Sequence, residues 1–204
     1  IWKTLRHTFD LSDRGLIMGV LNITPDSFSD GGRYLDPAAA VAQAVRMEAW
    51  GAGIIDIGGE STRPGALEVS AEEEMRRILP VIRAVRERTA CALSVDAMKA
   101  RVAVAAVEAG ADIINDISGL QADPDMAAAA AETGAGLVLM HMQGTPQTMQ
   151  LSPGYSDVVR EIQDCLRGSL RAAVAAGVAM EAIALDPGIG FGKTMEHNLT
   201  VLRQ

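Results

Sequence analysis

One short pattern that occurs three times limits what this chain can fold into more than any other feature. Each copy begins with Gly-Ala, continues with one further residue and ends in a run of apolar residues; the copies start at Gly51, Gly110 and Gly134. Glycine suits the left-handed position that closes a helix, and an uninterrupted apolar run suits a strand buried on both faces. Each copy therefore predicts a helix that leads into a strand of a parallel sheet.

The same alternation of helix and strand extends along the chain. Short β-rich runs predict six strands, at 16–21, 54–57, 92–95, 113–115, 137–140 and 183–185. Alanine-rich segments between them predict helices at about 37–51, 71–88, 101–108, 125–132 and 157–176, and a sixth helix before Gln204. Ser70 followed by Glu73 indicates a capping box at the start of the second helix.

Strict alternation is compatible with an open doubly wound sheet or with a closed (β/α)8 TIM barrel. Polar or glycine-rich residues follow nearly every expected strand, whereas an open sheet gathers its ligand groups at one switch point. The sequence therefore favours an α/β fold of the barrel type. Because a full barrel usually needs about 250 residues and eight units, we expect a single domain over 1–204 that holds about six of the eight units, truncated before the last two.

An incomplete barrel leaves two strands with an unpaired edge. Apolar side chains meant for the closed interior then lose their cover. We expect these 204 residues, expressed alone, to self-associate and to show little catalytic activity.

Composition and charge exclude several classes of protein. Apolar residues make up 49% of the chain, too many for a disordered protein, and 26 acidic against 18 basic residues give a net charge of −8. An acidic balance argues against nucleic acid as a partner, because binding to its backbone needs a basic face. No apolar run is long enough to span a membrane, and Cys91 and Cys165 form no CxxC pair. We expect a cytoplasmic protein with two free thiols.

Six polar residues stand at or near the ends of the expected strands: Asn22, Asp56, Asp96, Asn115, His141 and Asp186. In a barrel these side chains converge on one mouth. A carboxylate only accepts hydrogen bonds while an amide both donates and accepts, so the set suits a polar heterocycle. His141 has no neighbouring pattern of metal ligands, so we expect it to be a packed or hydrogen-bonded barrel residue.

Three loops have compositions typical of binding sites. The glycine-rich segment 186–194 matches neither a P-loop, because Pro187 occupies the first glycine position, nor the dinucleotide fingerprint, and it predicts a wall that a flat ligand approaches. Polar loops span 22–32 and 60–65. Arg63 can bind phosphate or carboxylate oxygens in a fork; the alternative is a surface arginine paired with Glu60 or Glu68.

Six segments together resemble the dihydropteroate synthase family of pterin-binding barrels: 21–32, 58–65, 94–99, 113–118, 139–144 and 185–193. The resemblance implies a transferase of folate biosynthesis. It would condense dihydropterin-CH2-diphosphate with 4-aminobenzoate, release diphosphate and use Mg2+ as cofactor. The resemblance also implies a sulfonamide target whose full-length parent is a homodimer.

The resemblance further implies a role for individual residues. Catalytic residues that grip the pterin edge would be Asp96, Asn115 and Asp186, and residues along its faces would be Ile117, Met140, Gly190 and Phe191. Asn22 would bind Mg2+ and diphosphate, and Thr62 and Arg63 would contact the diphosphate. Loop residues that order around 4-aminobenzoate would be Phe28, Asp30 and Pro64.

The family's Ser-Arg-Lys segment and its Arg-x-His segment have no counterpart before Gln204. One alternative is therefore a catalytically incompetent pterin-binding fragment. A second is a methyltetrahydrofolate methyltransferase domain, although that class lacks the Thr-Pro-Asp-Ser-Phe-Ser-Asp loop. An unrelated phosphate-binding barrel is the third alternative.

Overall fold

The computed structural model describes residues 1–24, 37–63 and 66–204. Its main element is a six-stranded parallel sheet in the order β3-β4-β5-β6-β7-β8. The strands are β3 (Met18–Asn22), β4 (Ile54–Gly58), β5 (Ala92–Asp96), β6 (Ile113–Asp116), β7 (Gly136–Met140) and β8 (Ile183–Asp186). The helices are α1 (Pro37–Ala49), α2 (Ala71–Arg86), α3 (Ala100–Ala109), α4 (Met126–Thr133), α5 (Val158–Ala175) and α6 (Met195–Arg203). All six predicted strands and all six predicted helices are confirmed.

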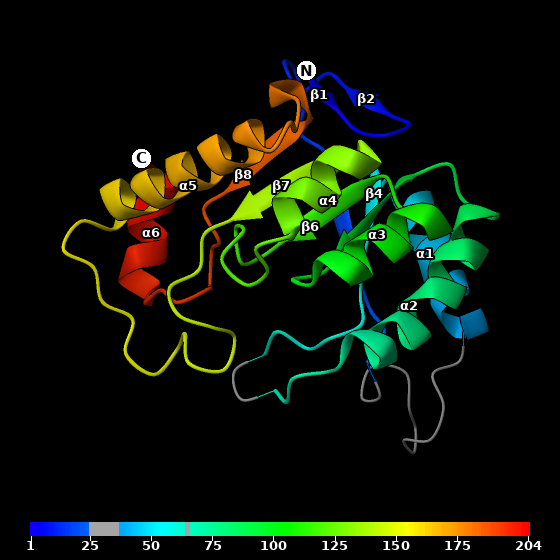
Figure 1. Ribbon diagram of the computed structural model, residues 1–204, viewed down its shortest axis with the longest axis horizontal. Coiled ribbons are helices and arrows are strands. Elements are labelled where there is room, and N and C mark those ends of the chain that lie inside the picture. Colours follow the sequence, from blue (N-terminus) through cyan, green and yellow to red (C-terminus); the bar gives the residue numbers. More distant parts are fainter. Residues whose placement is uncertain (25–36, 64–65) are drawn as a thin grey trace.

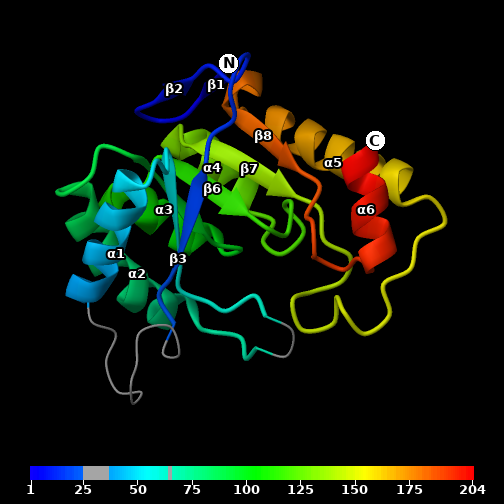
Figure 2. The same cartoon turned by 180° about the vertical axis from the view of Figure 1, so that it is seen from behind.

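The strand order decides between the two architectures that the sequence allowed. Each strand pairs in parallel with the next strand along the chain, whereas a doubly wound sheet reverses its order at a switch point. The helices lie along the outer side of the sheet, and β3 and β8 form its two edges (Figures 1 and 2). The described chain is thus six consecutive β/α units of a barrel, as the sequence predicted.

Alternation along each strand creates two apolar layers. Every second strand residue faces the helices, and this outer layer includes Leu21, Ile55, Leu93, Ile114 and Leu137. The intervening residues face the other side of the sheet, called here the inner side. Burial on both sides explains why the strands read as continuous apolar runs. Val20 of edge strand β3 also faces this inner side and is 55% exposed.

A short hairpin covers the amino-terminal end of the inner side. Strands β1 (Trp2–Lys3) and β2 (Thr8–Phe9) pair antiparallel, and Trp2 packs against Ile54, Ala92, Ile113 and Val138. The Trp2 indole Nε1 donates a hydrogen bond to the carbonyl oxygen of Ala182 at 2.9 Å. The sequence did not predict this hairpin, because strands of two residues show no alternation. Because the hairpin covers the amino-terminal end, the carboxyl end of the sheet is the open end.

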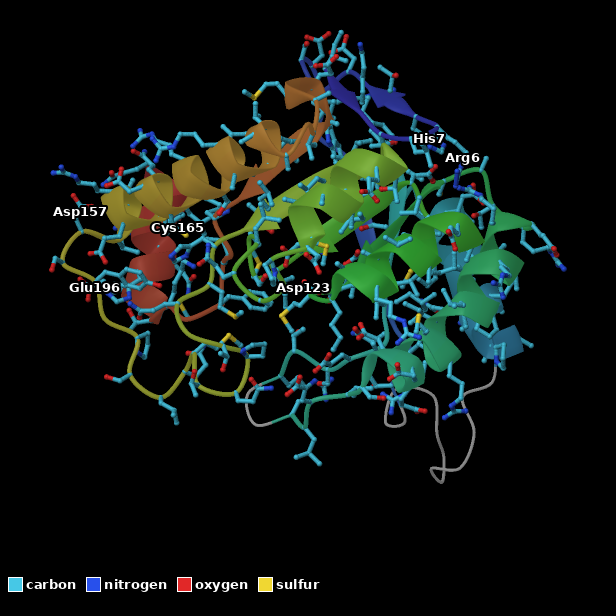
Figure 3. The ribbon with its side chains drawn as sticks, viewed as in Figure 1. Arg6, His7, Asp123, Asp157, Cys165 and Glu196 are labelled. Carbon is cyan, nitrogen blue, oxygen red and sulfur yellow. The ribbon has the colours of Figure 1, made fainter. Side chains whose placement is uncertain are left out.

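One buried carboxylate ties the hairpin to the barrel. Asp112 is fully buried, and its oxygens lie 2.9 Å from Arg6 Nε and 2.8 Å from Arg86 Nη1. The backbone N–H of Leu93 also donates to Asp112, at 2.9 Å. Figure 3 labels Arg6 in the turn of the hairpin, between β1 and β2. Asp112 thus joins the hairpin, α2 and β5.

The start of α2 corrects one detail. Ser70 caps the helix as predicted, because its side chain accepts the backbone N–H of Glu73 at 3.3 Å. The reciprocal half of the predicted capping box is wrong. The Glu73 carboxylate instead accepts hydrogen bonds from Arg76 and Arg77, which lie one turn further along the helix.

We expect Asp112→Ala to lower the free energy of unfolding by about 3 kcal/mol, because it leaves a buried arginine contact and a backbone N–H without their acceptor. Urea unfolding measures the change. Asp164→Ala is the matched control: its ion pair with Arg167 lies on the surface, so its loss should be within about 0.5 kcal/mol. Equal losses in the two variants would contradict the role of Asp112.

Candidate functional site

Four residues of one layer meet on the inner side, at the carboxyl ends of the strands. Asn22 pairs in register with Gly58, Gly58 with Asp96, and Asp96 with Asn115. They come from four adjacent strands, β3 to β6. The fold therefore brings together three polar side chains that the sequence singled out, around one glycine that it did not.

Gly58 keeps the space between Asn22 and Asp96 open. A Cβ atom on Gly58 would lie 3.4 Å from Asp96 Oδ2 and 3.7 Å from Asn22 Oδ1. Both oxygens therefore point over the glycine, and a larger side chain there would enter the space between them. The exposed Asn22 and the partly buried Asp96 can contact one ligand that lies over Gly58.

A second polar layer lies beneath the first. Asp56 pairs in register with Ser94, and the Asp56 carboxylate Oδ2 accepts a hydrogen bond from Asn115 Nδ2 at 3.1 Å. Asp56 Oδ1 and Ser94 Oγ are buried and have no hydrogen-bond partner among the described residues. Buried polar atoms of native proteins are seldom unpaired, so these two mark the floor of the site as functional.

Several carboxyl groups lie close together at the floor. Burial raises the pKa of Asp96 well above its usual range, and the nearby carboxyl groups of Asp56, Glu74 and Asp116 raise it further. Burial also raises the pKa of Asp56. Acceptors held this way favour a ligand that supplies N–H donors or positive charge.

A buried ion network supports the loop between β4 and α2. Lys99 Nζ lies 2.5 Å from Glu60 Oε2 and 2.9 Å from Glu74 Oε2. Glu60 Oε1 also accepts the backbone N–H of Val69 at 3.3 Å. Both ends of the loop that includes Thr62 and Arg63 are thereby fixed to α2 and to the loop after β5.

Arg63 itself is exposed, and Thr62 is partly buried. In the part of the chain that the structure describes, no ion pair joins Arg63 to Glu60 or Glu68. Glu60 is paired with Lys99 instead. The alternative of a paired surface arginine is therefore not what this structure has.

A buried lysine organises the glycine-rich loop after β8. Lys193 Nζ donates to the carbonyl oxygens of Gly188 and Phe191, at 2.8 and 2.9 Å, and lies 3.0 Å from Nδ1 of His141. Burial lowers the pKa of Lys193 to about 8 and that of His141 to about 4, so the imidazole is neutral and accepts at neutral pH. The expectation that His141 is packed and hydrogen-bonded is confirmed.

The same loop orients Asp186. Asp186 Oδ1 accepts the backbone N–H of Gly188 at 2.7 Å. Gly188 has a φ of +67°, and a Cβ atom there would lie 2.0 Å from the carbonyl oxygen of His141, so only glycine fits. No role for Lys193 was predicted from the sequence. The available signal was a lysine directly after a glycine-rich turn, with no phosphate motif around it.

The remaining predicted site residues divide into two groups. Ile117 and Met140 are buried at the carboxyl ends of β6 and β7, Phe191 is partly buried and Gly190 is exposed. Phe28, Asp30 and Pro64 lie outside the described residues.

Metal and membrane features are limited in the described chain. Within residues 1–24, 37–63 and 66–204, no group of three or more His, Cys, Asp and Glu side chains could hold a metal ion. None of the described helices is long and apolar enough to cross a membrane. Cys91 and Cys165 are free thiols, as predicted.

Comparison with known proteins identifies the family of this chain. The family model of pterin binding enzymes matches residues 18–204. Dihydropteroate synthase of Synechocystis is 48% identical over 196 residues, which are 96% of this chain and 68% of that protein.

Two solved structures have the same fold. Yersinia pestis dihydropteroate synthase, in a sulfonamide drug complex, is 49% identical with a TM-score of 0.91, over 98% of this chain and 72% of that one. Xanthomonas albilineans dihydropteroate synthase, in complex with 7,8-dihydropteroate, is 42% identical with a TM-score of 0.82, over 94% of this chain and 67% of that one. This chain spans about two thirds of the length of such relatives. By sequence and fold, it belongs to the pterin-binding enzymes and, among them, to the dihydropteroate synthase family of transferases.

Proposed function

We propose that Asp96, Asn115 and Asp186 hold the pterin half of a dihydropterin diphosphate while its methylene carbon is transferred to 4-aminobenzoate. The observation that carries this proposal is the register of Asp96 with Asn115 on adjacent strands, which sets a carboxyl and an amide side by side above the unpaired oxygens of the floor. The Xanthomonas relative in complex with 7,8-dihydropteroate, the product of this reaction, supports it.

The chemistry of the ring fits these groups. The amino-pyrimidinone edge of a pterin has adjacent N–H donors, and an ionised carboxylate accepts two of them without offering a competing donor. The buried side chains of Met140 and Ile117 supply apolar surface for the flat faces of the ring. Donor-poor rings of the same size should bind more weakly, because the carboxylates would then lose water without gaining a partner.

The cluster of carboxyl groups at the floor also suits the transition state. When the C–O bond to diphosphate breaks, positive charge develops on the pterin methylene carbon, and fixed carboxylates stabilise it. The amine of 4-aminobenzoate is largely neutral at pH 7, so its lone pair forms the new C–N bond and its proton is then released. Positioning of the two substrates therefore does most of what the protein must do, and no protein nucleophile is needed.

The diphosphate end fits Asn22, Thr62 and Arg63. Asn22 has an exposed amide oxygen beside Asp96, and Mg2+ is commonly bound through one or two oxygen ligands together with substrate phosphates. When bound, Mg2+ would neutralise charge on the departing diphosphate. The exposed guanidinium of Arg63, on a loop anchored by Lys99, would bind the outer phosphate oxygens.

Further parts of the proposal rest on the resemblance and the composition. Phe28, Asp30 and Pro64 would contact 4-aminobenzoate, and the complete protein would act as a homodimer. The free thiols and the acidic composition suit the cytoplasm. A methyltetrahydrofolate methyltransferase is disfavoured, because the relatives at 42–49% identity are dihydropteroate synthases.

We expect Asp96→Ala and Asp186→Ala each to weaken the binding of pteroic acid about tenfold or more, which corresponds to about 1.4 kcal/mol. Each substitution removes an acceptor for the pterin edge. Isothermal calorimetry measures the change, with Asp164→Ala on the surface as the control. Undiminished binding in both site variants would exclude this assignment.

We also expect Asp96 to lower the free energy of unfolding of the unliganded protein. A raised pKa means that the folded state binds the proton more tightly than the unfolded chain does, so stability is lost as the pH rises from the ordinary aspartate pKa through the raised one. We expect Asp96→Asn to raise the free energy of unfolding at pH 8 by about 1 kcal/mol while it weakens pteroic acid binding. Urea unfolding at pH 5 and pH 8 tests this. A variant less stable than the parent at pH 8 would contradict it.

Asn22→Ala should weaken magnesium-dependent binding of diphosphate more than binding of pteroic acid. The amide oxygen is a hard ligand that suits Mg2+, and Mg2+ would lie on the phosphates. Calorimetry with diphosphate, with and without Mg2+, separates the two effects, and Gln163→Ala on the exposed face of α5 is the control for loss of a side-chain amide. Equal losses for diphosphate and pteroic acid would count against this role.

A further inference from the structure

We propose that Asp56 is a positioning residue for Asn115. By accepting a hydrogen bond from the amide nitrogen of Asn115, it leaves the amide oxygen to face the bound ring. This inference rests on the proposed function, because it concerns the same pterin site. It gives a role to a residue that would not itself touch the ligand.

The geometry sets the direction of the Asn115 amide. Asp56 Oδ2 accepts from Asn115 Nδ2 at 3.1 Å, and a carboxylate offers acceptors only. Asp56 is 4% exposed and pairs in register with Ser94, whereas Asn115 pairs with Asp96, one layer nearer the carboxyl end. With its nitrogen held below by Asp56, Asn115 keeps its oxygen for the open side of the layer.

The consequence is recognition by polarity. A ring N–H over Asn115 needs an acceptor, and a reversed amide would set an N–H group against it. The unpaired donors would weaken binding. Asp56 would thus help to select donor-bearing rings through a contact on the far side of Asn115.

The setting of Asp56 argues against a merely structural role. Other residues on the inner side of these strands, Ile54, Ala92 and Ile113, are apolar and buried. A buried carboxylate costs several kcal/mol unless it is well paired, and Asp56 Oδ1 has no hydrogen-bond partner among the described residues. An apolar side chain would build the same sheet at lower cost, so the carboxylate points to function.

A double-mutant cycle on the whole protein tests the proposal, with pteroic acid as the calorimetric probe. We expect Asp56→Ala and Asn115→Ala each to weaken binding about tenfold, and the double variant to bind within about twofold of Asn115→Ala alone, because Asp56 acts through Asn115. Asp56→Asn keeps an acceptor oxygen for Asn115 Nδ2 and should lose clearly less than Asp56→Ala. Asp164→Ala, on the exposed surface of α5, is the matched aspartate control and should change binding by less than about twofold in either background.

Independent losses that multiply in the double variant would overturn the proposal, since a merely structural Asp56 would give that result. If Asn115→Ala leaves binding unchanged, the proposed pterin site fails and this inference fails with it; a loss in Asn115→Ala together with multiplying effects removes only the inference. If Asp56→Ala does not fold, the cycle is run with Asp56→Asn. Its loss of affinity must then disappear in the Asn115→Ala background, and a loss that persists there would overturn the proposal.

Discussion

The rest of this structure depends on the alternation of side chains across a buried parallel sheet. Each strand sends one set of residues towards the helices and the other towards the inner side. The first set, which includes Ile55, Leu93 and Leu137, forms the main core. The second set changes character along the strand, from apolar residues that pack on Trp2 to polar residues at the carboxyl end. Stability and ligand binding are therefore built from the same strands.

The polar end of that second set is costly to the unliganded protein. Asp56 and Asp96 have raised pKa values because burial and neighbouring carboxyl groups disfavour their charge. Lys99 does not offset this charge, because its ammonium group is paired with Glu60 and Glu74. A ligand that supplies donors or positive charge would relieve this imbalance, so the electrostatic strain of the floor and the selectivity proposed for it would have one cause.

Two lysines give the site its rigid surroundings. Lys99 fixes the ends of the loop after β4, and Lys193 binds the loop after β8 to His141. Neither lysine needs to touch a substrate for this. The ammonium group of each lysine takes the place of water around several buried acceptors. It thereby joins segments from different β/α units.

The sequence alone determined the order of strands and helices, because glycine-closed helices and doubly buried strands leave local patterns. It favoured the barrel over an open sheet, and the segments after the strands indicated the family. It also indicated Asn22, Asp96, Asn115 and Asp186, since polar residues that end apolar strands are visible along the chain. The hairpin at Trp2, the node at Asp112 and the pairing of Lys193 with His141 were decided only by the tertiary structure. So was the bond between Asp56 and Asn115. These contacts join residues far apart in sequence, and their partners are chosen by distance in the folded chain, which no local pattern encodes.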